Sequence, residues 1–259
     1  FWGSDLLGTG AAGRALQHRL LSKTDVITAV SPDLLHTTRT SFGPRIEPKL
    51  RELRFGLTTI ESMRDLNWTK PAARKELGLP ATGPIISLSY HGGEINRHFP
   101  ILTQLEQADL PPDTTIVIPL AYGGTVARRA EIKAAAERSP LRCVTFTSYL
   151  SVERIAALRT AADILIHVPV SDAFSGSMSE HLYAGNRVIT GSWLPFGWLA
   201  DHGIGMDLVN RLEDTGAMVE RVIRDLDRTP TDLPSRQDAI WNLVSWEKNL
   251  PRWLEVLGG

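Results

Sequence analysis

The stretch 164–189 constrains the fold of this chain more than any other. Its first part, 164–168, is an apolar run short enough for a buried strand, and it stops at a loop, 169–176, that is rich in turn-forming residues. A short helical stretch follows and ends at Gly185, before a second apolar run. The stretch therefore predicts a strand, a loop, a helix and a second strand parallel to the first.

Two acids belong to this unit. Asp172 lies in the loop, and Glu180 lies about one turn into the helix. Ligands bind beyond the carboxyl ends of the strands in open parallel sheets, so both carboxylates can face one crevice. The N–H groups of 175–177 open the helix, and such a terminus attracts phosphate or sugar oxygens. The alternative is a loop acid or helix cap at 172 and a solvated helix residue at 180.

Downstream of residue 84 the chain alternates between apolar strand-like runs and helical stretches. The strand-like runs are 85–90, 115–120, 143–147, 164–168, 188–190 and 206–209. In the stretches between them apolar residues share one helical face, as Ile155, Leu158 and Ala162 do. Alternating strands and helices predict an α/β fold with a parallel sheet and right-handed crossovers.

The acid pair and the segment after it resemble a known family. Asp172, seven residues, Glu180 and then Leu-Tyr-Ala-Gly-Asn-Arg-Val-Ile is similar to the donor-site signature of the large retaining GT-B glycosyltransferase family, Glu-x7-Glu followed by an Ala-Gly segment. The resemblance implies a GT-B-like fold, with a Rossmann-like C-terminal domain and an incomplete N-terminal Rossmann-like domain. It implies that Glu180 holds the ribose hydroxyls of a nucleotide sugar and that Asp172, one methylene shorter than the family's Glu, faces the transferred sugar.

By the same resemblance, backbone N–H groups at the helix start contact sugar or phosphate oxygens. The residues concerned are Ser175, Gly176 and Ser177. In the loop 91–98 the family carries an Arg and a Lys five residues apart, which neutralise the diphosphate. Arg97 stands at the Lys position, or is a surface cation at a helix start, and Gly92 stands at the Arg position, so one cation is missing. His91 replaces that charge only when protonated, and Gly93 completes the predicted loop site.

Two further residues have roles by resemblance. Tyr149 follows the run 143–147, where the family's backbone meets the nucleobase, and it either stacks on the base or packs against the protein. The opening Phe-Trp-Gly-Ser-Asp resembles the end of a strand in the family's N-terminal domain, with Asp5 facing the acceptor. The alternative for this opening is a turn with a helix cap.

Composition and resemblance together divide the chain. The segment 65–84, rich in Pro and Gly around a short helix, is the predicted linker. Residues 1–69 are the predicted remnant of an acceptor-side domain, and 70–229 are the predicted nucleotide-sugar domain. The amphipathic tail, 230–259, is predicted to restart its helix at Pro251 and resembles the family's terminal helix, which crosses back to the N-terminal domain. Because the first residue is not Met, the true N-terminal part is expected to be absent.

Charge, apolar runs and cysteine content argue against a nucleic-acid-binding, membrane-spanning or disulfide-rich protein. There are 28 Lys and Arg against 29 Asp and Glu, so no basic field favours nucleic acid. No apolar run approaches the length of a membrane span, about 20 residues, and no signal peptide opens the chain. The single cysteine, Cys143, cannot form a disulfide framework. These features predict a cytoplasmic protein. The basic group Arg45, Lys49, Arg51 and Arg54 is either a peripheral contact with a phospholipid-linked acceptor or a solvated face.

Two motifs point to other chemistry. Residues 8–13 satisfy G-x-G-x-x-G, but no clear apolar strand leads into them and no acid ends the next strand, as a dinucleotide site requires. Asp225-Leu226-Asp227 has the D-x-D form of a metal site but lies in the last turn of an amphipathic helix. The seven histidines show no metal-ligand spacing. No metal and no cofactor are therefore expected.

These observations predict an enzyme: a retaining, metal-independent glycosyltransferase of the hexosyltransferase type. Its donor is a nucleotide diphosphate sugar, and its acceptor is a hydroxyl of a saccharide, a lipid-linked molecule or a protein, in polysaccharide or glycoconjugate biosynthesis. The missing cation and the shorter acid favour a second hypothesis, a catalytically silent relative that binds nucleotide sugars or assembles with an active partner. A dehydrogenase is the third, and it requires NAD binding that depends on Gly8 and Gly10.

Overall fold

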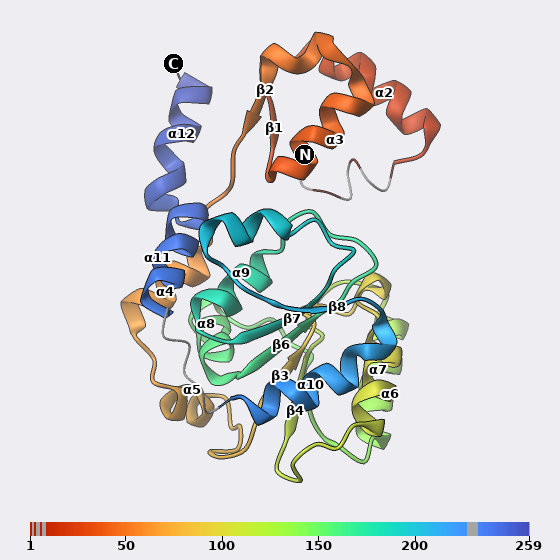
Figure 1. Ribbon diagram of the computed structural model, residues 1–259, viewed down its shortest axis with the longest axis vertical. Coiled ribbons are helices and arrows are strands. Elements are labelled where there is room, and N and C mark those ends of the chain that lie inside the picture. The colour runs from red at the N-terminus through yellow and green to blue at the C-terminus, as the bar shows by residue number, and fades with distance from the viewer. Residues whose placement is uncertain (2, 4–5, 7–8, 227–232, 259) are drawn as a thin grey trace.

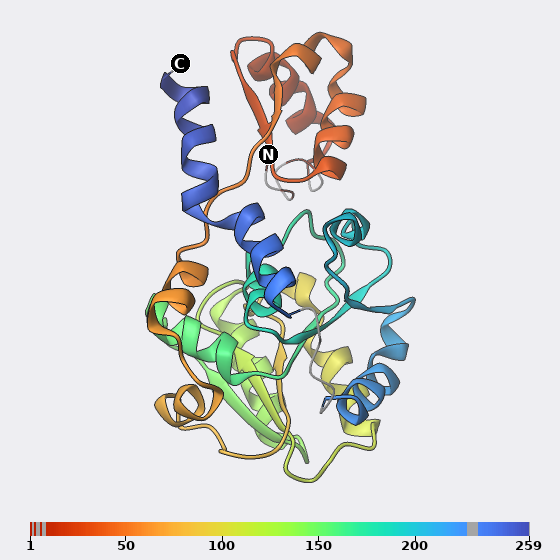
Figure 2. The ribbon, with the colours of Figure 1, turned by 60° about the vertical axis from the view of Figure 1, so that its left-hand side comes forward.

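The computed structural model describes residues 1–259 except 2, 4–5, 7–8, 227–232 and 259. Two lobes of different size lie one above the other along the long axis of the molecule, and the C-terminal helix returns to the smaller lobe (Figure 1, Figure 2). None of the helices among the described residues is long and apolar enough to cross a bilayer.

The smaller lobe is built from the N-terminal part of the chain. Its elements are helix α2 (Ala11–Leu21), strand β1 (Ile27–Ala29), helix α3 (Pro32–Phe42), the 3-10 helix η1 (Pro44–Lys49) and strand β2 (Leu50–Glu52). β1 and β2 are parallel. Ser31 caps α3, because its Oγ accepts the N–H of Leu34 at 3.2 Å, and Pro32 takes the first helical position, which suits its fixed φ.

The larger lobe contains a six-stranded, fully parallel sheet. Its strands are β3 (Ile85–Leu88), β4 (Thr115–Pro119), β5 (Arg142–Phe146), β6 (Ile164–His167), β7 (Arg187–Gly191) and β8 (Asp207–Val209). Their order across the sheet is β5-β4-β3-β6-β7-β8. Each predicted strand-like run is therefore a strand, to within two residues at either end, and the predicted α/β class with a parallel sheet is confirmed.

Helices cover both faces of this sheet (Figure 1). One face packs against α6 (His98–Gln107), α7 (Val126–Arg138) and α10 (Thr215–Arg224). The other packs against α4 (Thr58–Leu66), α5 (Lys70–Glu76), α8 (Val152–Ala161), α9 (Gly176–Tyr183) and α11 (Leu233–Val244). The 3-10 helices η2 (Glu94–Asn96), η3 (Gly197–His202) and η4 (Leu212–Asp214) lie in connections. Burial from both sides explains why the strands are continuous apolar runs in the sequence.

The chain passes between the lobes after β2, not in the predicted linker 65–84. α4 packs on the larger sheet through Ile60 and Met63. α5, the short helix inside the predicted linker, buries Ala73 against the same face, and Leu77, which directly follows the helix, is buried there too. This segment is Pro- and Gly-rich yet packed, so the linker prediction is wrong, and residue 69 lies within the larger lobe.

The C-terminal tail forms α11 and α12 (Trp246–Gly258). The predicted restart at Pro251 is wrong, because Pro251 lies inside α12 and the break is at Ser245. Ser245 is fully buried, and its Oγ accepts an N–H from the first turn of α12 at 3.2 Å, so it caps that helix. α12 runs back to the smaller lobe, where Arg252 donates to the carbonyl of Glu52 at 2.7 Å (Figure 2).

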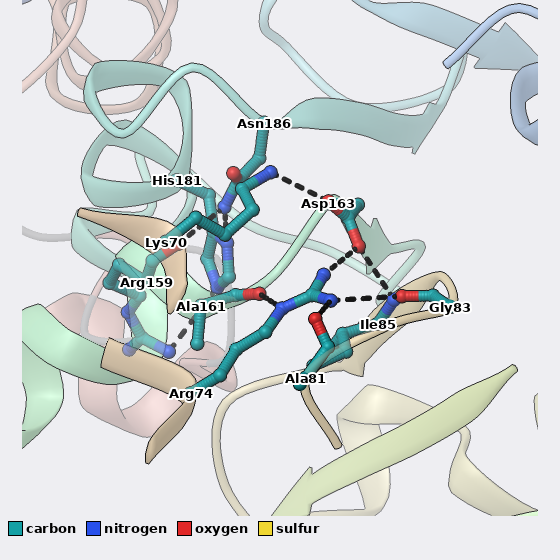
Figure 3. Close-up of polar contacts among 10 residues, drawn as sticks. All are labelled: Lys70, Arg74, Ala81, Gly83, Ile85, Arg159, Ala161, Asp163, His181 and Asn186. Atoms are coloured by element: carbon teal, nitrogen blue, oxygen red, sulfur yellow. Dashed lines mark hydrogen bonds and ion pairs between the residues drawn. The ribbon is translucent and has the colours of Figure 1, made fainter. Parts of the chain in front are cut away.

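At the amino end of the sheet a largely buried carboxylate joins three elements (Figure 3). Asp163 precedes β6, and its Oδ2 accepts both from Arg74 of α5 and from the N–H of Ile85 in β3, each at 2.7 Å. Its Oδ1 contacts Lys70 at 2.6 Å. The other donors of Arg74 reach the carbonyls of Ala81, Gly83 and Ala161, each at 3.1 Å. The network holds α5 on the sheet and β3 beside β6.

The buried member of this network is expected to dominate stability. Arg74→Met leaves the Asp163 carboxylate, 13% exposed, without its buried partner and should lower the free energy of unfolding by about 3–5 kcal/mol. The Lys70 side chain, the other partner of this carboxylate, is 44% exposed. Lys70→Met should therefore lower the free energy of unfolding by less than about 1 kcal/mol. Urea denaturation measures both, and equal losses would contradict this assignment.

Candidate functional site

The strand order creates a crevice at the carboxyl ends of β3 and β6. From β3 the chain moves outward through β4 to β5 and then returns to β6 on the other side of β3. In open parallel sheets, ligands bind at such a reversal. The predicted residues His91, Gly92, Gly93 and Arg97 follow β3, and Asp172 follows β6. The topology therefore brings two predicted segments to one edge of the sheet.

Asp172 is held by two hydrogen bonds in the loop after β6. Its Oδ2 lies 2.8 Å from Nε2 of His167, the last residue of β6, and its Oδ1 accepts the N–H of Ala173 at 2.7 Å. The His167 side chain is fully buried, whereas that of Asp172 is 15% exposed. Sequence reasoning misses His167, for which the available signal is a histidine at the end of an otherwise apolar strand.

Asp172 lines a cavity of about 270 Å³ between the two lobes. The larger lobe also contributes Trp193, whose indole donates to the carbonyl of Pro169 at 2.9 Å. The smaller lobe contributes Ser31 and Asp33, at the start of α3. The cavity thus has carboxylates from both lobes and an aromatic ring in its wall.

Glu180 is buried in α9 and paired with Arg159 of α8. Its Oε2 accepts from Nε of Arg159 at 2.9 Å, and the two side chains are 11% and 8% exposed. Nη1 of Arg159 also lies 3.3 Å from Nε2 of His181 (Figure 3). The other ring nitrogen of His181, Nδ1, lies 2.7 Å from the side-chain nitrogen of Asn186. Burial, with Arg159 beside it, holds the pKa of His181 well below its ordinary value. Glu180 as a solvated helix residue is therefore wrong, and sequence reasoning misses Arg159.

His91 is a neutral donor at the crevice. Its Nδ1 accepts the N–H of Gly93 at 2.9 Å and lies 3.0 Å from the side-chain nitrogen of Asn96. Burial lowers the pKa of His91. With Nδ1 accepting, the neutral ring carries its proton on Nε2 and offers a hydrogen bond without a charge. In this neutral form His91 supplies a hydrogen-bond donor but no positive charge.

The loops that contain Gly92-Gly93 and Gly123-Gly124 are in close contact at this edge, and Arg129 of α7 packs against both. The N–H of Gly92 donates to the carbonyl of Tyr122 at 2.8 Å, and a Cβ at Gly124, whose φ is +63°, would lie 2.5 Å from the Gly92 oxygen. A Cβ at Gly92 would lie 2.6 Å from Cγ of Arg129. Arg129 donates from Nη1 to the carbonyls of Gly123 and Gly124, at 3.1 and 2.9 Å. The positive charge of Arg129 therefore lies beside Gly92, the position at which the sequence analysis found no cation.

Arg97 is the predicted cation of the same loop. It precedes α6 with φ +53°, and its guanidinium carbon lies 5.3 Å from the ring centroid of Trp193, within cation–π range. No described residue forms an ion pair with it. Because Trp193 lines the cavity beside Asp172, this charge lies at the margin of that cavity.

The start of α9 is fixed by its cap. The Oγ of Ser175 accepts the N–H of Met178 at 3.2 Å, so this hydroxyl is already engaged. A Cβ at Gly176 would lie 3.2 Å from Leu57 in the segment that joins the lobes, which leaves little room for a side chain there. The N–H groups of Gly176 and Ser177 make no backbone hydrogen bond within the described residues. They are the open donors of this helix start.

An aromatic pocket lies at the ends of β4 and β5. Its lining includes Tyr90, Pro119, Ala121, Tyr122, Phe146, Ser148, Tyr149, Leu150, Ile155, Leu158 and Arg159. Tyr122 and Tyr149 stack with ring centroids 6.1 Å apart and an interplanar angle of 11°, and Tyr149 is 77% exposed. Tyr149 is thus an exposed ring over the pocket rather than a packed one.

The aromatic pocket is connected to both acids through their partner residues. Arg159 lines it and holds Glu180. Tyr90 lines it too, and its ring lies 5.7 Å from that of His167, which holds Asp172. Burial, with the negative charge of Asp172 added, raises the pKa of Tyr90, so its phenol remains a donor.

Other predicted features either lie outside the described residues or lack the structure that they require. Asp5 and Gly8 lie outside the described residues, as does Asp227. No described strand leads into Gly10, and β1 comes only after α2, so the dinucleotide interpretation lacks its strand. Within the described ranges, no three or more His, Cys, Asp or Glu side chains are grouped so as to hold a metal ion.

Solved structures share this arrangement of lobes. Sucrose-phosphate synthase from Thermosynechococcus elongatus matches with a TM-score of 0.78 and 15% identity, over 96% of this chain and 61% of that one. Anabaena HepE in complex with UDP and glucose matches with a TM-score of 0.75 and 16% identity, over 96% of this chain and 68% of that one. A Rickettsia africae glycosyltransferase matches with a TM-score of 0.72 and 16% identity, over 97% and 68%. The fold is that of the GT-B glycosyltransferases.

The predicted GT-B-like fold is thus confirmed, while the roles of single residues stay predictions. At 15–16% identity these likenesses concern the fold alone, and the chain spans 61% of the length of the sucrose-phosphate synthase. No family model and no curated protein matches the sequence.

A buried imidazole behind the crevice gives a pH prediction. His98, the first residue of α6, is 2% exposed, and burial, with His91 and Arg128 nearby, lowers its pKa to about 4. The unfolded chain binds this proton near pH 6.5, so the His98 contribution to stability is complete above that pH and is lost as the pH falls toward about 4. In His98→Phe, the fall in the free energy of unfolding between pH 6.5 and about 4 should be smaller by about 3 kcal/mol. Urea denaturation at a series of pH values measures this difference. An unchanged pH dependence would contradict this.

Proposed function

We propose that this chain transfers a sugar from a nucleotide diphosphate sugar to a hydroxyl acceptor, with retention and without a metal ion. One observation carries the proposal: at the switch point of a GT-B sheet, the aromatic pocket is lined by Arg159, which holds Glu180, and by Tyr90, whose ring lies 5.7 Å from that of His167, the partner of Asp172. The likeness to HepE, solved with UDP and with UDP-glucose, supports this donor class.

In the proposed pose the nucleobase occupies the aromatic pocket, against Tyr122 and Tyr149. The ribose lies at Glu180, whose Oε2 is held by Arg159 while Oε1 has no hydrogen-bond partner among the described residues. A carboxylate fixed through one oxygen can accept a ribose hydroxyl with the other without reorienting. The transferred sugar then extends toward Asp172, which lines the cavity between the lobes.

The diphosphate lies between Arg97 and Arg129 in this pose. Arg97 supplies the predicted charge, and Arg129 supplies the one that position 92 lacks. The N–H groups of Gly176 and Ser177 and the Nε2–H of His91 add neutral donors. Two guanidinium groups and a helix start balance the charge that develops on the diphosphate as it leaves.

The proposed reaction is a front-face displacement. The bond from the anomeric carbon to the diphosphate oxygen breaks, the acceptor oxygen bonds to the same face of that carbon, and the acceptor proton passes to the departing diphosphate. Asp172 is not assigned as a nucleophile, because His167 engages its Oδ2 and the N–H of Ala173 its Oδ1. It stabilises positive charge on the sugar ring and accepts sugar hydroxyls. The acceptor is a saccharide, lipid-linked or protein hydroxyl.

Calorimetric titration of the chain with UDP, GDP, ADP and dTDP tests donor binding. One nucleotide is expected to bind, and Tyr149→Ala should weaken it about tenfold, because base–aromatic stacking contributes about 1–3 kcal/mol. Tyr183→Phe is the control, since Tyr183 packs on Trp241, outside the crevice. Failure of every nucleotide to bind would overturn the proposal.

Donor hydrolysis by the chain tests the chemistry. Asp172→Asn should lower turnover about a hundredfold while nucleotide affinity stays unchanged, because the carboxylate acts on the sugar rather than on the nucleotide. Nucleotide binding without turnover of any donor sugar would instead support the catalytically silent alternative.

The role of Arg129 has its own test. Arg129→Gln should weaken UDP binding about tenfold and leave the binding of uridine, which has no phosphate, unchanged. Arg138→Gln, at the far end of the same helix α7, is the matched control. Equal loss of UDP and uridine affinity would show that Arg129 only holds the two glycine loops.

A further inference from the structure

A pocket of about 460 Å³ opens on the side of the larger lobe where α11 ends and α12 begins. Its volume falls in the range of small-molecule sites, about 300–1,000 Å³. α4 contributes Arg64 to its lining, α9 contributes Tyr183, and α11 and the first turn of α12 contribute the rest (Figure 1). Tyr183 is the last residue of α9, whose first residue lies at the crevice, and none of the described lining residues lines either cavity there. The pocket is therefore separate from the candidate site.

The helices around this pocket are joined to one another by specific contacts. The N–H of Trp246, the first residue of α12, donates to Oε1 of Glu61 in α4 at 2.9 Å. The guanidinium carbon of Arg64 in α4 lies 3.7 Å from a ring centroid of Trp241 in α11. Because the walls belong to helices that hold one another in place, the pocket is formed before any ligand arrives, and binding needs little ordering of the chain.

The charges in the lining of this pocket compensate one another. Glu247 pairs with both cations: its Oε1 lies 2.8 Å from Nζ of Lys248, and its Oε2 lies 3.4 Å from Nη1 of Arg64. Lys248, with Arg64 beside it, holds the pKa of Glu247 below its ordinary value, so this carboxylate stays ionised at neutral pH. Asp238 adds a second carboxylate to the lining. Two cations thus face two anions, and a ligand gains no net attraction from carrying a charge.

Three side chains of α11 bring open polar atoms to this pocket. The carboxylate of Asp238 accepts no hydrogen bond from the described residues and pairs with no cation among them, and the side-chain amide of Asn242 is likewise open. Gln237 donates from Nε2 to the carbonyl of Tyr183 at 2.9 Å, which leaves its Oε1 as an acceptor. Within about one turn of a helix the pocket therefore offers a carboxylate, an amide oxygen and a complete amide.

We infer that this pocket binds a neutral saccharide through the side chains of Gln237, Asp238 and Asn242. Each sugar hydroxyl both donates and accepts, so neighbouring hydroxyls of one ring donate to the carboxylate and the amide oxygens and accept from the amide N–H groups of Asn242. An anion meets the open carboxylate of Asp238, and a cation meets Lys248 and Arg64. An apolar ligand would leave the open polar groups desolvated without partners. The pocket holds a sugar without acting on it, and the inference does not rest on the proposed transfer reaction.

Titration of the chain with linear oligosaccharides of glucose, mannose and galactose, each α- and β-linked, tests the inference by saturation-transfer NMR. At least one of these neutral probes is expected to bind, and the acidic probe oligogalacturonate is not. Asp238→Ala should weaken the binding about tenfold, because a hydrogen bond to a charged group is lost. Asn242→Trp, at an exposed position, should abolish it by filling the pocket. Glu255→Ala, which removes an exposed carboxylate of α12 outside the pocket, is the matched control and should bind as the unchanged chain does.

The inference is overturned if no neutral oligosaccharide binds, if neutral and acidic probes bind equally, or if Glu255→Ala weakens binding as much as Asp238→Ala does. Loss of binding in Trp193→Ala with none in Asp238→Ala would also overturn it, because the saccharide would then occupy the cavity between the lobes. Circular dichroism confirms that each variant is folded. UDP binding by Asp238→Ala should be unchanged, so failure of this inference is distinguished from failure of the proposed function.

Discussion

The larger lobe depends on the carboxylate of Asp163. This residue lies at the amino end of the sheet, where β3 meets β6. Its side chain accepts the N–H of Ile85, its own N–H donates to the Ile85 carbonyl at 2.8 Å, and its carbonyl accepts from Arg187 in β7 at 3.0 Å. A slip of one residue would turn the buried side chains of a strand to the wrong face. The register set here therefore also decides that His167, at the other end of β6, points at Asp172.

The crevice combines two acids that are held by charged or ring-nitrogen partners with two cations that form no ion pair among the described residues. Asp172 and Glu180 are held by His167 and Arg159, which belong to neighbouring elements, so both carboxylates are oriented before any ligand arrives. Such pairing is what allows ionised groups to be buried. No ion pair among the described residues engages Arg97 or Arg129, so in the proposed pose their charge is available to the diphosphate. Under the proposed function, such an arrangement would need little rearrangement on binding a diphosphate, which is the condition for effective electrostatic stabilisation.

The strands could be predicted from the sequence, and most partners in the site could not. Strands buried on both faces leave continuous apolar runs, so the six strands of the larger sheet can be located to within two residues. Arg129 lies beside Gly92 only because β3 and β4 are neighbours, and no local pattern records that contact. The missed break at Ser245 has a similar cause: Pro251 is the stronger helix signal in the sequence, but a buried hydroxyl capping α12 decides where the helix begins.

Arg54 joins the lobes and is the member of the predicted basic group that is not solvated. It is 5% exposed, forms an ion pair with Glu52, and lies 4.7 and 5.6 Å from the ring centroids of Trp198 and Phe174. These rings belong to the larger lobe, and Phe174 directly follows the Asp172 loop. A change in lobe orientation would therefore disturb the packing of a buried guanidinium against two aromatic rings. Because the cavity beside Asp172 takes its walls from both lobes, its shape is coupled to this stack, and a ligand that bridges the lobes acts on a packed joint rather than on a free hinge.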